Sequence, residues 1–269
     1  MFQSQTGIEP AANAARLVEM IDAASAGGAA MLFTPEMSGM LDRDAARATA
    51  KARAEKDDEV LAAGQAAAKS NGVWVHLGSL AIRREDGKLA NRGFVIDAAG
   101  DIRARYDKIH LFDVDLPTGE RWRESALYAG GSEAVMAHST PIGELGLSIC
   151  YDLRFPALFE RLSEAGADVI AVPAAFTVPT GRAHWEVLMR ARAIETSAFV
   201  VAAAQVGTHE DGRATFGHSL VIDPWGEIIL DMAGRPGLAF AEIDLERIAE
   251  VRARIPVVAH RKPIAPIAI

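Results

Sequence analysis

The stretch LGLSICYDLRFPALF, residues 145–159, carries the clearest structural signal in the sequence. Its apolar first half, Leu145 to Tyr151, predicts a buried strand. A proline is favourable in the first turn of a helix, so residues 156–165 predict a helix directly afterwards. A strand that runs straight into a helix indicates an α/β protein.

Cys150, the single cysteine of the chain, stands at the end of this predicted strand. At a strand-to-helix turn a side chain is held rigidly at the edge of the sheet, close to free backbone N–H groups. A lone cysteine is usually a small buried apolar residue. Here Asp152 and Arg154 follow at once, and polar residues after an apolar strand indicate a pocket that solvent reaches. Cys150 is therefore a candidate nucleophile.

Short strands and amphipathic helices alternate along the rest of the chain. Apolar residues at helical spacing, followed by Gly27 and Gly28, predict a helix over 10–26. The charged, Ala-rich stretch 42–70 predicts one long surface helix, and 107–131 predicts a loop with one helical turn. Further helices are predicted at 183–197 and from 245 onward, and strands or hairpins at 29–37, 73–82, 93–106, 168–176, 199–206, 218–230 and 237–243.

Residues 95–102 (VIDAAGDI) and 221–228 (VIDPWGEI) resemble each other. Each predicts a strand, an acidic turn that contains glycine, and a returning strand. Two interpretations stay open: two unrelated hairpins with favourable turn residues, or a pseudo-duplicated sandwich in which each half contributes a sheet and its covering helices. No Gly/Ser-rich linker separates the halves, so we expect a single domain over 1–269 with a shared core.

The composition excludes several classes of function. Apolar residues make up 50% and charged residues 24%, as in folded proteins. A net charge of −8 repels phosphate, so neither nucleic acid nor an anionic membrane is an expected partner. No apolar run reaches the roughly 18 residues that span a bilayer, and MFQSQTGIEP lacks the features of a signal peptide. Together with the single cysteine, which excludes a disulfide framework, these features predict a cytoplasmic protein.

Nucleotide-binding and metal-binding motifs are missing from the sequence. It contains neither a phosphate-binding G-x-x-x-x-G-K-[ST] nor a zinc-binding H-E-x-x-H motif. Its seven histidines are scattered without the spacing of ligands. We therefore expect no metal and no cofactor.

Two charged residues at the ends of other predicted strands could activate Cys150. A thiol with a pKa of about 8.5 needs a base or a cation beside it to react near neutrality. Glu36 ends a predicted strand in the motif TPEM, and Lys108 interrupts the apolar segment YDKIHLF. Taken alone, each residue is equally well explained as a salt-bridged surface residue.

The segments FTPEM, YDKIHLFD and GLSICYDLRFP occur in the order Glu, Lys, Cys, and together they resemble the nitrilase superfamily of carbon–nitrogen hydrolases. The similarity extends over almost the whole chain. It implies a four-layer αββα sandwich with pseudo-duplicated halves, and assembly into a homodimer or a larger homo-oligomer. It also implies a triad in which Glu36 is the general base, Lys108 stabilises the oxyanion and Cys150 is the nucleophile. For a base that works near pH 7, burial should raise the pKa of Glu36, opposed by Lys108.

The segments around CYDLRF, RAHWEVLMRARAIETS and GHSLVIDPWGE are similar to the Nit amidase branch, most of all to deaminated glutathione amidases, with ω-amidases close behind. This resemblance implies hydrolysis of a small carboxylate-bearing amide, either deaminated-glutathione-like or the ω-amide of a 2-oxo acid. It also implies further site residues: Glu124 as a second active-site glutamate, Tyr151 as a backbone oxyanion donor, Arg154 as the partner of the substrate carboxylate, and Phe176 and Thr180 in the pocket. An exposed charge remains the alternative for Glu124, and a salt bridge with Asp152 or Glu160 remains the alternative for Arg154.

Other functions stay open on the sequence. The chain could be a carbon–nitrogen hydrolase for an aliphatic amide, an N-carbamoyl compound or a nitrile. It could be a Cys-His thiol hydrolase that uses His110 or His184, or a non-catalytic binding protein on the same fold. Members of the family usually begin a few residues further upstream, so we expect the first strand to be nearly absent.

Overall fold

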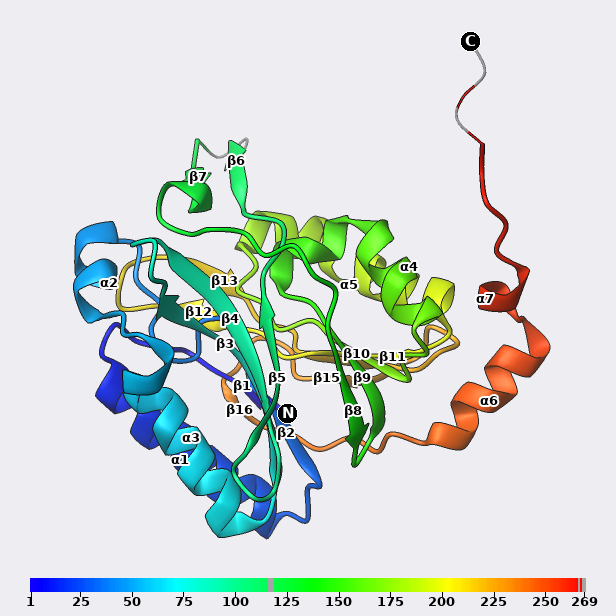
Figure 1. Cartoon of the computed structure of the whole chain (residues 1–269), viewed down its shortest axis with the longest axis horizontal. Coiled ribbons are helices and arrows are strands. Elements are labelled where there is room, and N and C mark those ends of the chain that lie inside the picture. The colour runs from blue at the N-terminus through cyan, green and yellow to red at the C-terminus, as the bar shows by residue number, and fades with distance from the viewer. Residues whose placement is uncertain (116–118, 266, 268–269) are drawn as a thin grey trace.

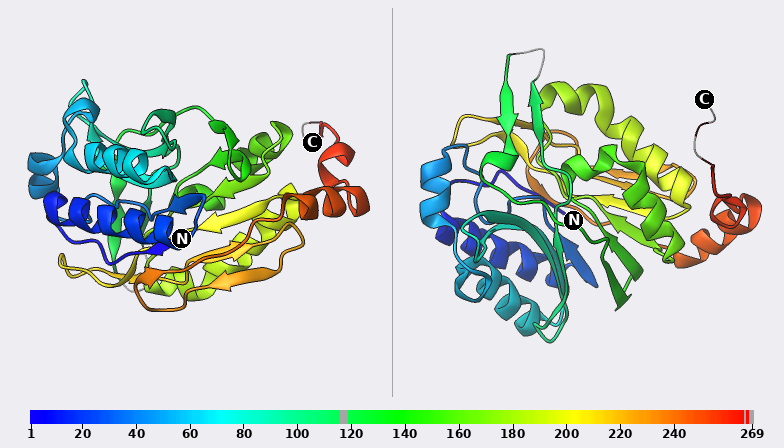
Figure 2. Two further views of the ribbon diagram at one scale, coloured as in Figure 1. Left: turned by 90° about the horizontal axis from the view of Figure 1, so that it is seen from below. Right: turned by 45° about the horizontal axis from the view of Figure 1, so that its top comes forward.

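Two β-sheets packed face to face form the centre of the molecule (Figure 1). The computed structural model describes residues 1–115, 119–265 and 267. The first sheet has the strand order β2-β3-β4-β5, and the second has the order β15-β14-β11-β10-β9-β8. Figure 2 shows α1 and α3 on the outer side of the first sheet and α4 and α5 on the outer side of the second. The fold is therefore the four-layer αββα sandwich that the sequence predicted.

The bounds of the elements in the first half are β1 Phe2–Gln3, α1 Pro10–Ala26, β2 Met31–Phe33, α2 Ala45–Lys51, η1 Glu55–Asp57, α3 Glu59–Asn71, β3 Trp74–Arg83, β4 Leu89–Ile96, β5 Ile102–Asp107, β6 Asp113–Asp115, β7 Arg121–Arg123 and η2 Glu124–Ala126. Those in the second half are β8 Met136–Thr140, β9 Gly143–Leu147, η3 Cys150–Arg154, α4 Pro156–Glu164, β10 Val169–Ala171, α5 Val178–Thr196, β11 Phe199–Ala202, β12 Val206–Thr208, β13 Ala214–Phe216, β14 Leu220–Ile222, β15 Ile228–Asp231, β16 Gly237–Leu238, α6 Leu245–Arg254 and α7 Val257–His260.

Alternation along the strands places apolar side chains in both interfaces of the sandwich. On β2, Leu32 packs with the helices α1 and α3. Its neighbours Met31 and Phe33 point the other way and share a cluster with Leu145 and Val169 of the second sheet. The two sheets consequently have a common apolar core between them.

The two halves repeat one order of elements. The first runs α1-β2-α3-β3-β4-β5 and the second α4-β10-α5-β11-β14-β15, and in each the first two strands are parallel while the others are antiparallel. The similar hairpins are equivalent: the backbone N–H of Gly100 donates to the Asp97 carbonyl, and that of Gly226 donates to the Asp223 carbonyl, at 2.9 Å in both. The structure thus favours pseudo-duplication over two unrelated hairpins.

The single helix predicted over 42–70 is wrong, because two aspartates cap separate helices there. The Asp44 carboxylate accepts a hydrogen bond from the backbone N–H of Arg47 and begins α2. The Asp58 carboxylate accepts from Val60 and Leu61 and begins α3. A capping carboxylate satisfies the free N–H groups of a first helical turn, so it favours a new start over continuation.

Several predicted strands also end earlier than their apolar runs. The strand expected over 145–151 ends at Leu147, and those expected over 168–176 and 237–243 are reduced to β10 and β16. The helix expected over 183–197 begins earlier, at Val178. The predicted loop 107–131 contains the predicted helical turn, η2, but also the hairpin β6–β7.

The two ends of the described chain lie in different surroundings. The two-residue strand β1 pairs with β16, and the Gln3 side chain is fully buried. Figure 1 shows α6 and α7 projecting from the side of the second sheet. Within the described ranges, no helix combines the length and apolarity needed to cross a bilayer.

Candidate active site

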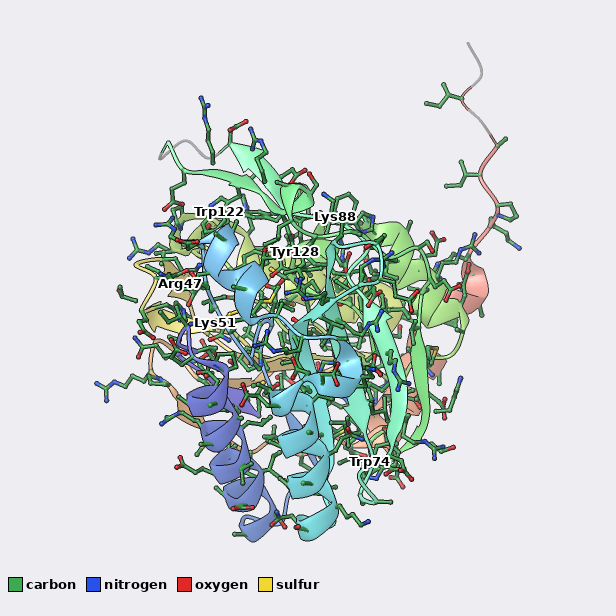
Figure 3. The ribbon with its side chains drawn as sticks, turned by 60° about the vertical axis from the view of Figure 1, so that its left-hand side comes forward. Arg47, Lys51, Trp74, Lys88, Trp122 and Tyr128 are labelled. Carbon is green, nitrogen blue, oxygen red and sulfur yellow. The ribbon has the colours of Figure 1, made fainter. Side chains whose placement is uncertain are left out.

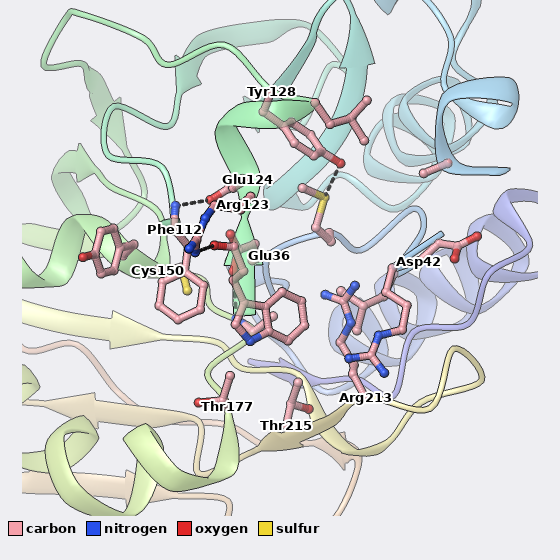
Figure 4. Close-up of a pocket in the computed structure, with 18 of the residues that line it drawn as sticks. Glu36, Asp42, Phe112, Arg123, Glu124, Tyr128, Cys150, Thr177, Arg213 and Thr215 are labelled. Carbon is pink, nitrogen blue, oxygen red and sulfur yellow. Dashed lines mark hydrogen bonds between the residues drawn. The ribbon is translucent and has the colours of Figure 1, made fainter. Parts of the chain in front are cut away.

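Glu36, Lys108 and Cys150 come together at one edge of the sandwich, although they follow strands of different sheets. Glu36 follows β2, Lys108 follows β5 and Cys150 follows β9. Only 4% of Glu36, 2% of Lys108 and 7% of Cys150 is exposed. Figure 4 shows Glu36, Glu124 and Cys150 gathered at one end of a cavity. The sequence predicted these four residues, and the structure brings them into one cluster.

Lys108 lies between two carboxylates. Its Nζ is 2.9 Å from Oε1 of Glu36 and 2.9 Å from Oε2 of Glu124. Glu124 also accepts a hydrogen bond from the Phe112 backbone N–H at 2.7 Å, and its side chain is 13% exposed. Glu124 is therefore not the exposed charge of the alternative interpretation.

Asn91, on β4, links the same two glutamates and was missed by the sequence analysis. Its Nδ2 donates to Oε1 of Glu36 at 2.9 Å and to Oε1 of Glu124 at 3.1 Å. Asn91 is 1% exposed, and its Oδ1 finds no partner among the described residues. Asparagine is depleted in strands, so a buried position in the run LANRGF was the signal that could have identified it.

Backbone groups from both halves hold the Glu36 carboxylate and its loop. Oε2 of Glu36 accepts a hydrogen bond from the backbone N–H of Ala175, which follows β10, at 2.9 Å. The Glu36 carbonyl accepts from Nε2 of Gln205 at 2.9 Å, and the next residue, Met37, donates its N–H to Oγ of Ser79. With these contacts the carboxylate has little freedom to turn away from Cys150.

Cys150 occupies a sharp turn between β9 and the short helix η3. Its φ is +50°, in the left-handed region that side chains other than glycine rarely adopt. The backbone N–H of Cys150 donates to the Pro173 carbonyl at 2.9 Å, which anchors the turn to the β10 loop. A residue held in such a conformation is turned out of the strand direction and toward the cavity.

Asp152 fastens the Cys150 turn to the segment that carries Lys108. Its fully buried carboxylate accepts hydrogen bonds from the Tyr106 hydroxyl at 2.7 Å and from the Ile149 N–H at 2.9 Å. It also contacts the backbone N–H and the ring Nδ1 of His110, at 3.0 and 2.7 Å. Since Tyr106 and His110 flank Lys108, this carboxylate sets the distance between Lys108 and Cys150.

The pKa of Glu36 is lowered, not raised as predicted. Burial is the largest effect and would raise it, but the charge of Lys108 and hydrogen bonds from Cys150, Lys108 and Asn91 together outweigh burial. Burial would also lower the pKa of Lys108, yet the charges of Glu124 and Glu36 hold it well above its usual value. The resting site thus contains a carboxylate and an ammonium group.

The Cys150 thiol has a pKa well above its usual value. Burial is the main cause, the negative charge of Glu36 adds to it, and the Lys108 charge opposes both. The thiol is therefore protonated at rest. Transfer of its proton to Glu36 is consequently uphill in the resting site.

The cavity in front of Cys150 has a volume of about 320 Å³. Of the predicted pocket residues, Tyr151, Phe176 and Thr180 line it. Figure 3 shows Trp122 and Tyr128 beside α2, and both residues line the cavity together with Ala45 and Ala48 of that helix.

Arg154 is not among the described residues that line the cavity. Its guanidinium lies 6.0 Å from the ring centre of Tyr151 and 5.6 Å from that of Phe176. Its Nη2 is 3.2 Å from Nδ1 of His184, and no salt bridge with Asp152 or Glu160 is seen in the described part of the chain. Its binding of a substrate carboxylate stays a prediction.

The described residues support neither a Cys-His catalytic pair nor a metal site. His110 is stacked on Phe155 with ring centres 3.5 Å apart, and neither His110 nor His184 lines the cavity. In the same ranges, no group of three or more His, Cys, Asp or Glu side chains has an arrangement that could hold a metal ion.

Comparison with known proteins gives a consistent result. Residues 2–253 match the family described as carbon-nitrogen hydrolase. A protein of Synechocystis sp. named deaminated glutathione amidase is 43% identical over 247 residues, which cover 90% of this chain and 90% of the relative. A protein of Rattus norvegicus with the same name is 39% identical over 249 residues, which cover 91% of this chain and 76% of the relative.

The crystal structure of the Caenorhabditis elegans NitFhit protein superposes on this chain with a TM-score of 0.88 at 37% sequence identity. The superposition covers 97% of this chain and 64% of that one, so this chain spans less than two thirds of NitFhit.

Proposed function

Because this chain belongs to the carbon–nitrogen hydrolase family, we propose that it is an amidase that hydrolyses a small carboxylate-bearing amide through a thioester on Cys150. The observation that carries the proposal is the arrangement of the buried Lys108 ammonium between Glu36 and Glu124, beside the buried Cys150 thiol. Relatives named deaminated glutathione amidase suggest a deaminated-glutathione-like substrate. The ω-amide of a 2-oxo acid is the related choice.

Acylation begins when the Cys150 sulfur attacks the amide carbonyl carbon and its proton passes to Glu36. Because the thiol pKa is raised and that of Glu36 is lowered, the proton moves together with the attack rather than before it. The oxyanion that forms is stabilised by the Lys108 ammonium and the Tyr151 backbone N–H. Collapse of this intermediate breaks the carbon–nitrogen bond, and Glu36 returns the proton to the departing amine.

Deacylation repeats the sequence with water. Glu36 accepts a proton from a water molecule that attacks the thioester carbonyl, and the acid product leaves as Cys150 regains its proton. Glu124 does not contact the thiol in this scheme. It holds Lys108 in place and balances its charge, so it is a positioning residue.

The test is a panel of deaminated glutathione, 2-oxoglutaramate, short aliphatic amides, N-carbamoyl amino acids and nitriles, with ammonia and amine release measured for each. We expect turnover of carboxylate-bearing amides, and a mass increase on Cys150 equal to the acyl group when the reaction is quenched in acid. Cys150→Ala should remain folded by circular dichroism and lose both signals. Turnover by Cys150→Ala at the wild-type rate would refute the mechanism.

The protein is further proposed to work as a homodimer or a larger homo-oligomer. On α5, Val187 is 69% and Ile194 49% exposed, and the neighbouring Trp225 is 47% exposed. Exposed apolar residues that adjoin one another favour a protein interface. Light scattering of Val187→Asp beside the wild type tests this, and an unchanged mass would exclude α5 from the interface. The free thiol that the mechanism needs favours a reducing compartment such as the cytoplasm.

A further inference from the structure

The residues that line the cavity change from polar at the Cys150 end, through aromatic, to cationic at its mouth. Beyond the polar cluster an aromatic wall begins at Tyr151, whose ring centre is 5.1 Å from that of Phe112. The wall continues from Phe112 to Trp122, 6.2 Å further on. At Trp122 the lining becomes cationic, and Figure 4 shows Arg213 on the opposite side of the cavity from Cys150.

Two guanidinium groups lie over the Trp122 ring. That of Arg213 is 5.0 Å from the ring centre and that of Arg43 is 5.7 Å from it. An aromatic face attracts a guanidinium and fixes its plane. Since the N–H donors project from the edge of that plane, both groups can still donate to a ligand in the cavity.

The hydrogen-bonding capacity of these two arginines is largely unused. Arg213 donates through Nε to the buried Asp211 carboxylate at 2.8 Å, and neither terminal nitrogen has a partner among the described residues. In the same ranges Arg43 forms no ion pair or side-chain hydrogen bond. By contrast, Arg123 at the same mouth is bound at both terminal positions by Asp115 and by backbone carbonyls.

This positive mouth stands out on a protein with a net charge of −8. Asp42, which precedes Arg43 in the sequence and also lines the cavity, is already paired with Arg47. Glu36 and Glu124 are paired with Lys108. The unpaired terminal nitrogens of Arg43 and Arg213 therefore have no acidic side chain left to bind among the described residues that line the cavity.

We propose that Arg43 and Arg213 form an anion subsite that binds a carboxylate at the end of the substrate remote from the scissile carbonyl. The substrate class is then an elongated amide, with an apolar spacer against Phe112 and Trp122 and an anionic end at the mouth. A guanidinium fork matches the two oxygens of a carboxylate, whereas an amide or ester end presents no charge. This subsite rests on the proposed amidase function and refines it.

The two arginines contribute unequally because their exposure differs. The Arg213 side chain is 16% exposed and anchored by Asp211, so its bond to a carboxylate is partly desolvated. We expect Arg213→Met to lower kcat/KM for an anionic amide about 10–100-fold. Arg43 is exposed, where water and salt weaken ion pairs, and Arg43→Met should cost about 2–5-fold.

The experiment compares matched amides with and without the remote charge. In the first series, each monoamide of an unbranched dicarboxylic acid of four to eight carbons is compared with its diamide. The rate for the diamide is halved because that substrate offers two scissile bonds. A second pair carries the charge on the leaving amine: deaminated glutathione and its C-terminal amide. For the wild type we expect higher kcat/KM on the charged member, largest at one spacer length and expressed mainly in KM.

In Arg213→Met this preference should be largely lost, because kcat/KM falls less for the neutral member than for the charged one. Arg213→Lys should restore little of it, because an ammonium lacks the fork. The matched control is Arg16→Met, which removes one exposed positive charge on α1 at a residue that does not line the cavity. Thermal unfolding is measured for each variant, and Arg43→Met tests the subsite at a surface position should Arg213→Met be unstable.

The proposal is overturned if neither series shows a preference for the charged member, or if both arginine variants retain that preference. An equal loss of this preference in Arg16→Met would also overturn the proposal, since the preference would then reflect only the net charge of the protein. Each of these leaves amide hydrolysis intact. Failure of the proposed amidase function is distinct, because the wild type would then neither release amine from any amide nor acquire an acyl group on Cys150.

Discussion

Replacing Lys108 by methionine should destabilise the fold as well as stop catalysis. The Nζ of Lys108 is 2.9 Å from a carboxylate oxygen of both Glu36 and Glu124, and the residue is 2% exposed. Methionine fills a similar volume but leaves the buried Glu36 carboxylate facing the partly buried Glu124 carboxylate. Removing one partner of a buried ion pair costs about 3–5 kcal/mol, which corresponds to a fall in Tm of about 6–20 °C in a protein of this size.

The destabilisation should depend on pH with a definite sign. Without the cation, burial and mutual repulsion raise the pKa of the carboxylate pair above its unfolded value of about 4.3. Groups whose pKa is raised in the folded state lower the free energy of unfolding as the pH rises through that raised pKa. The variant should therefore regain stability when the pH is lowered from about 8 to about 5. In the wild type the pKa of Glu36 is lowered, so its contribution is present above the unfolded value and is lost only as pH falls through the folded one.

Thermal unfolding at several pH values measures this effect. Steady-state kinetics measures the loss of the proposed oxyanion donor, which should lower kcat by about 10²–10³. Lys69→Met removes an exposed lysine on α3 and serves as the control. Adding Glu124→Gln to Lys108→Met removes one of the two charges, and should recover stability without activity. A Tm within about 2 °C of the wild type, or a loss in kcat below about tenfold, would refute the reasoning.

Two further predictions follow from the same network. The lowered pKa of Glu36 and the raised pKa values of Cys150 and Lys108 should keep kcat/KM for a neutral amide level between about pH 5 and pH 8; a steep limb near pH 7 would contradict this protonation state. Asp152→Asn should lower the free energy of unfolding by about 3–5 kcal/mol. Its NH2 group would face the O–H and N–H groups that now donate hydrogen bonds to the carboxylate. Thermal unfolding checks it, and a loss below about 1 kcal/mol would contradict it.

The helices and hairpins with explicit local signals were predictable from the sequence. Pro10 and the pair Gly27-Gly28 mark the limits of α1. The turns at Asp97 and Asp223 predicted their hairpins, because each contains an acidic residue followed by glycine. Asp44 and Asp58 were equally explicit caps, yet the charged, Ala-rich composition of 42–70 concealed them, so two helices were taken for one.

Strand ends were not predictable, because apolar runs continue beyond the sheets. Ile149 and Ala174 are 1% and 0% exposed, yet each follows the end of its strand and belongs to a loop buried between the sheets. Burial rather than strand structure requires their apolar character. The loops that carry the candidate site therefore look like strand in the sequence.

The candidate site was predictable only in part, for a related reason. Glu36, Lys108 and Cys150 were visible through motifs that resemble a known family. The contact of Asn91 with both glutamates depends on the pairing of β4 with its neighbours. Arg43, Trp122 and Arg213 meet from three distant segments, and a single sequence contains no signal for such a meeting.

Pseudo-duplication explains why the site forms at this edge of the sandwich. β2 and β10 are equivalent strands, and the carboxyl ends of parallel strands are where loops can build a site. The loop after β2 carries Glu36, and the equivalent loop after β10 supplies the Ala175 N–H that binds its carboxylate at 2.9 Å. At Gly78 the halves approach so closely that a Cβ would lie 2.6 Å from Cβ of Pro173 in the other half. The proposed general base is thus held by backbone from the other half, and a shift of one half against the other would move Glu36 away from Cys150.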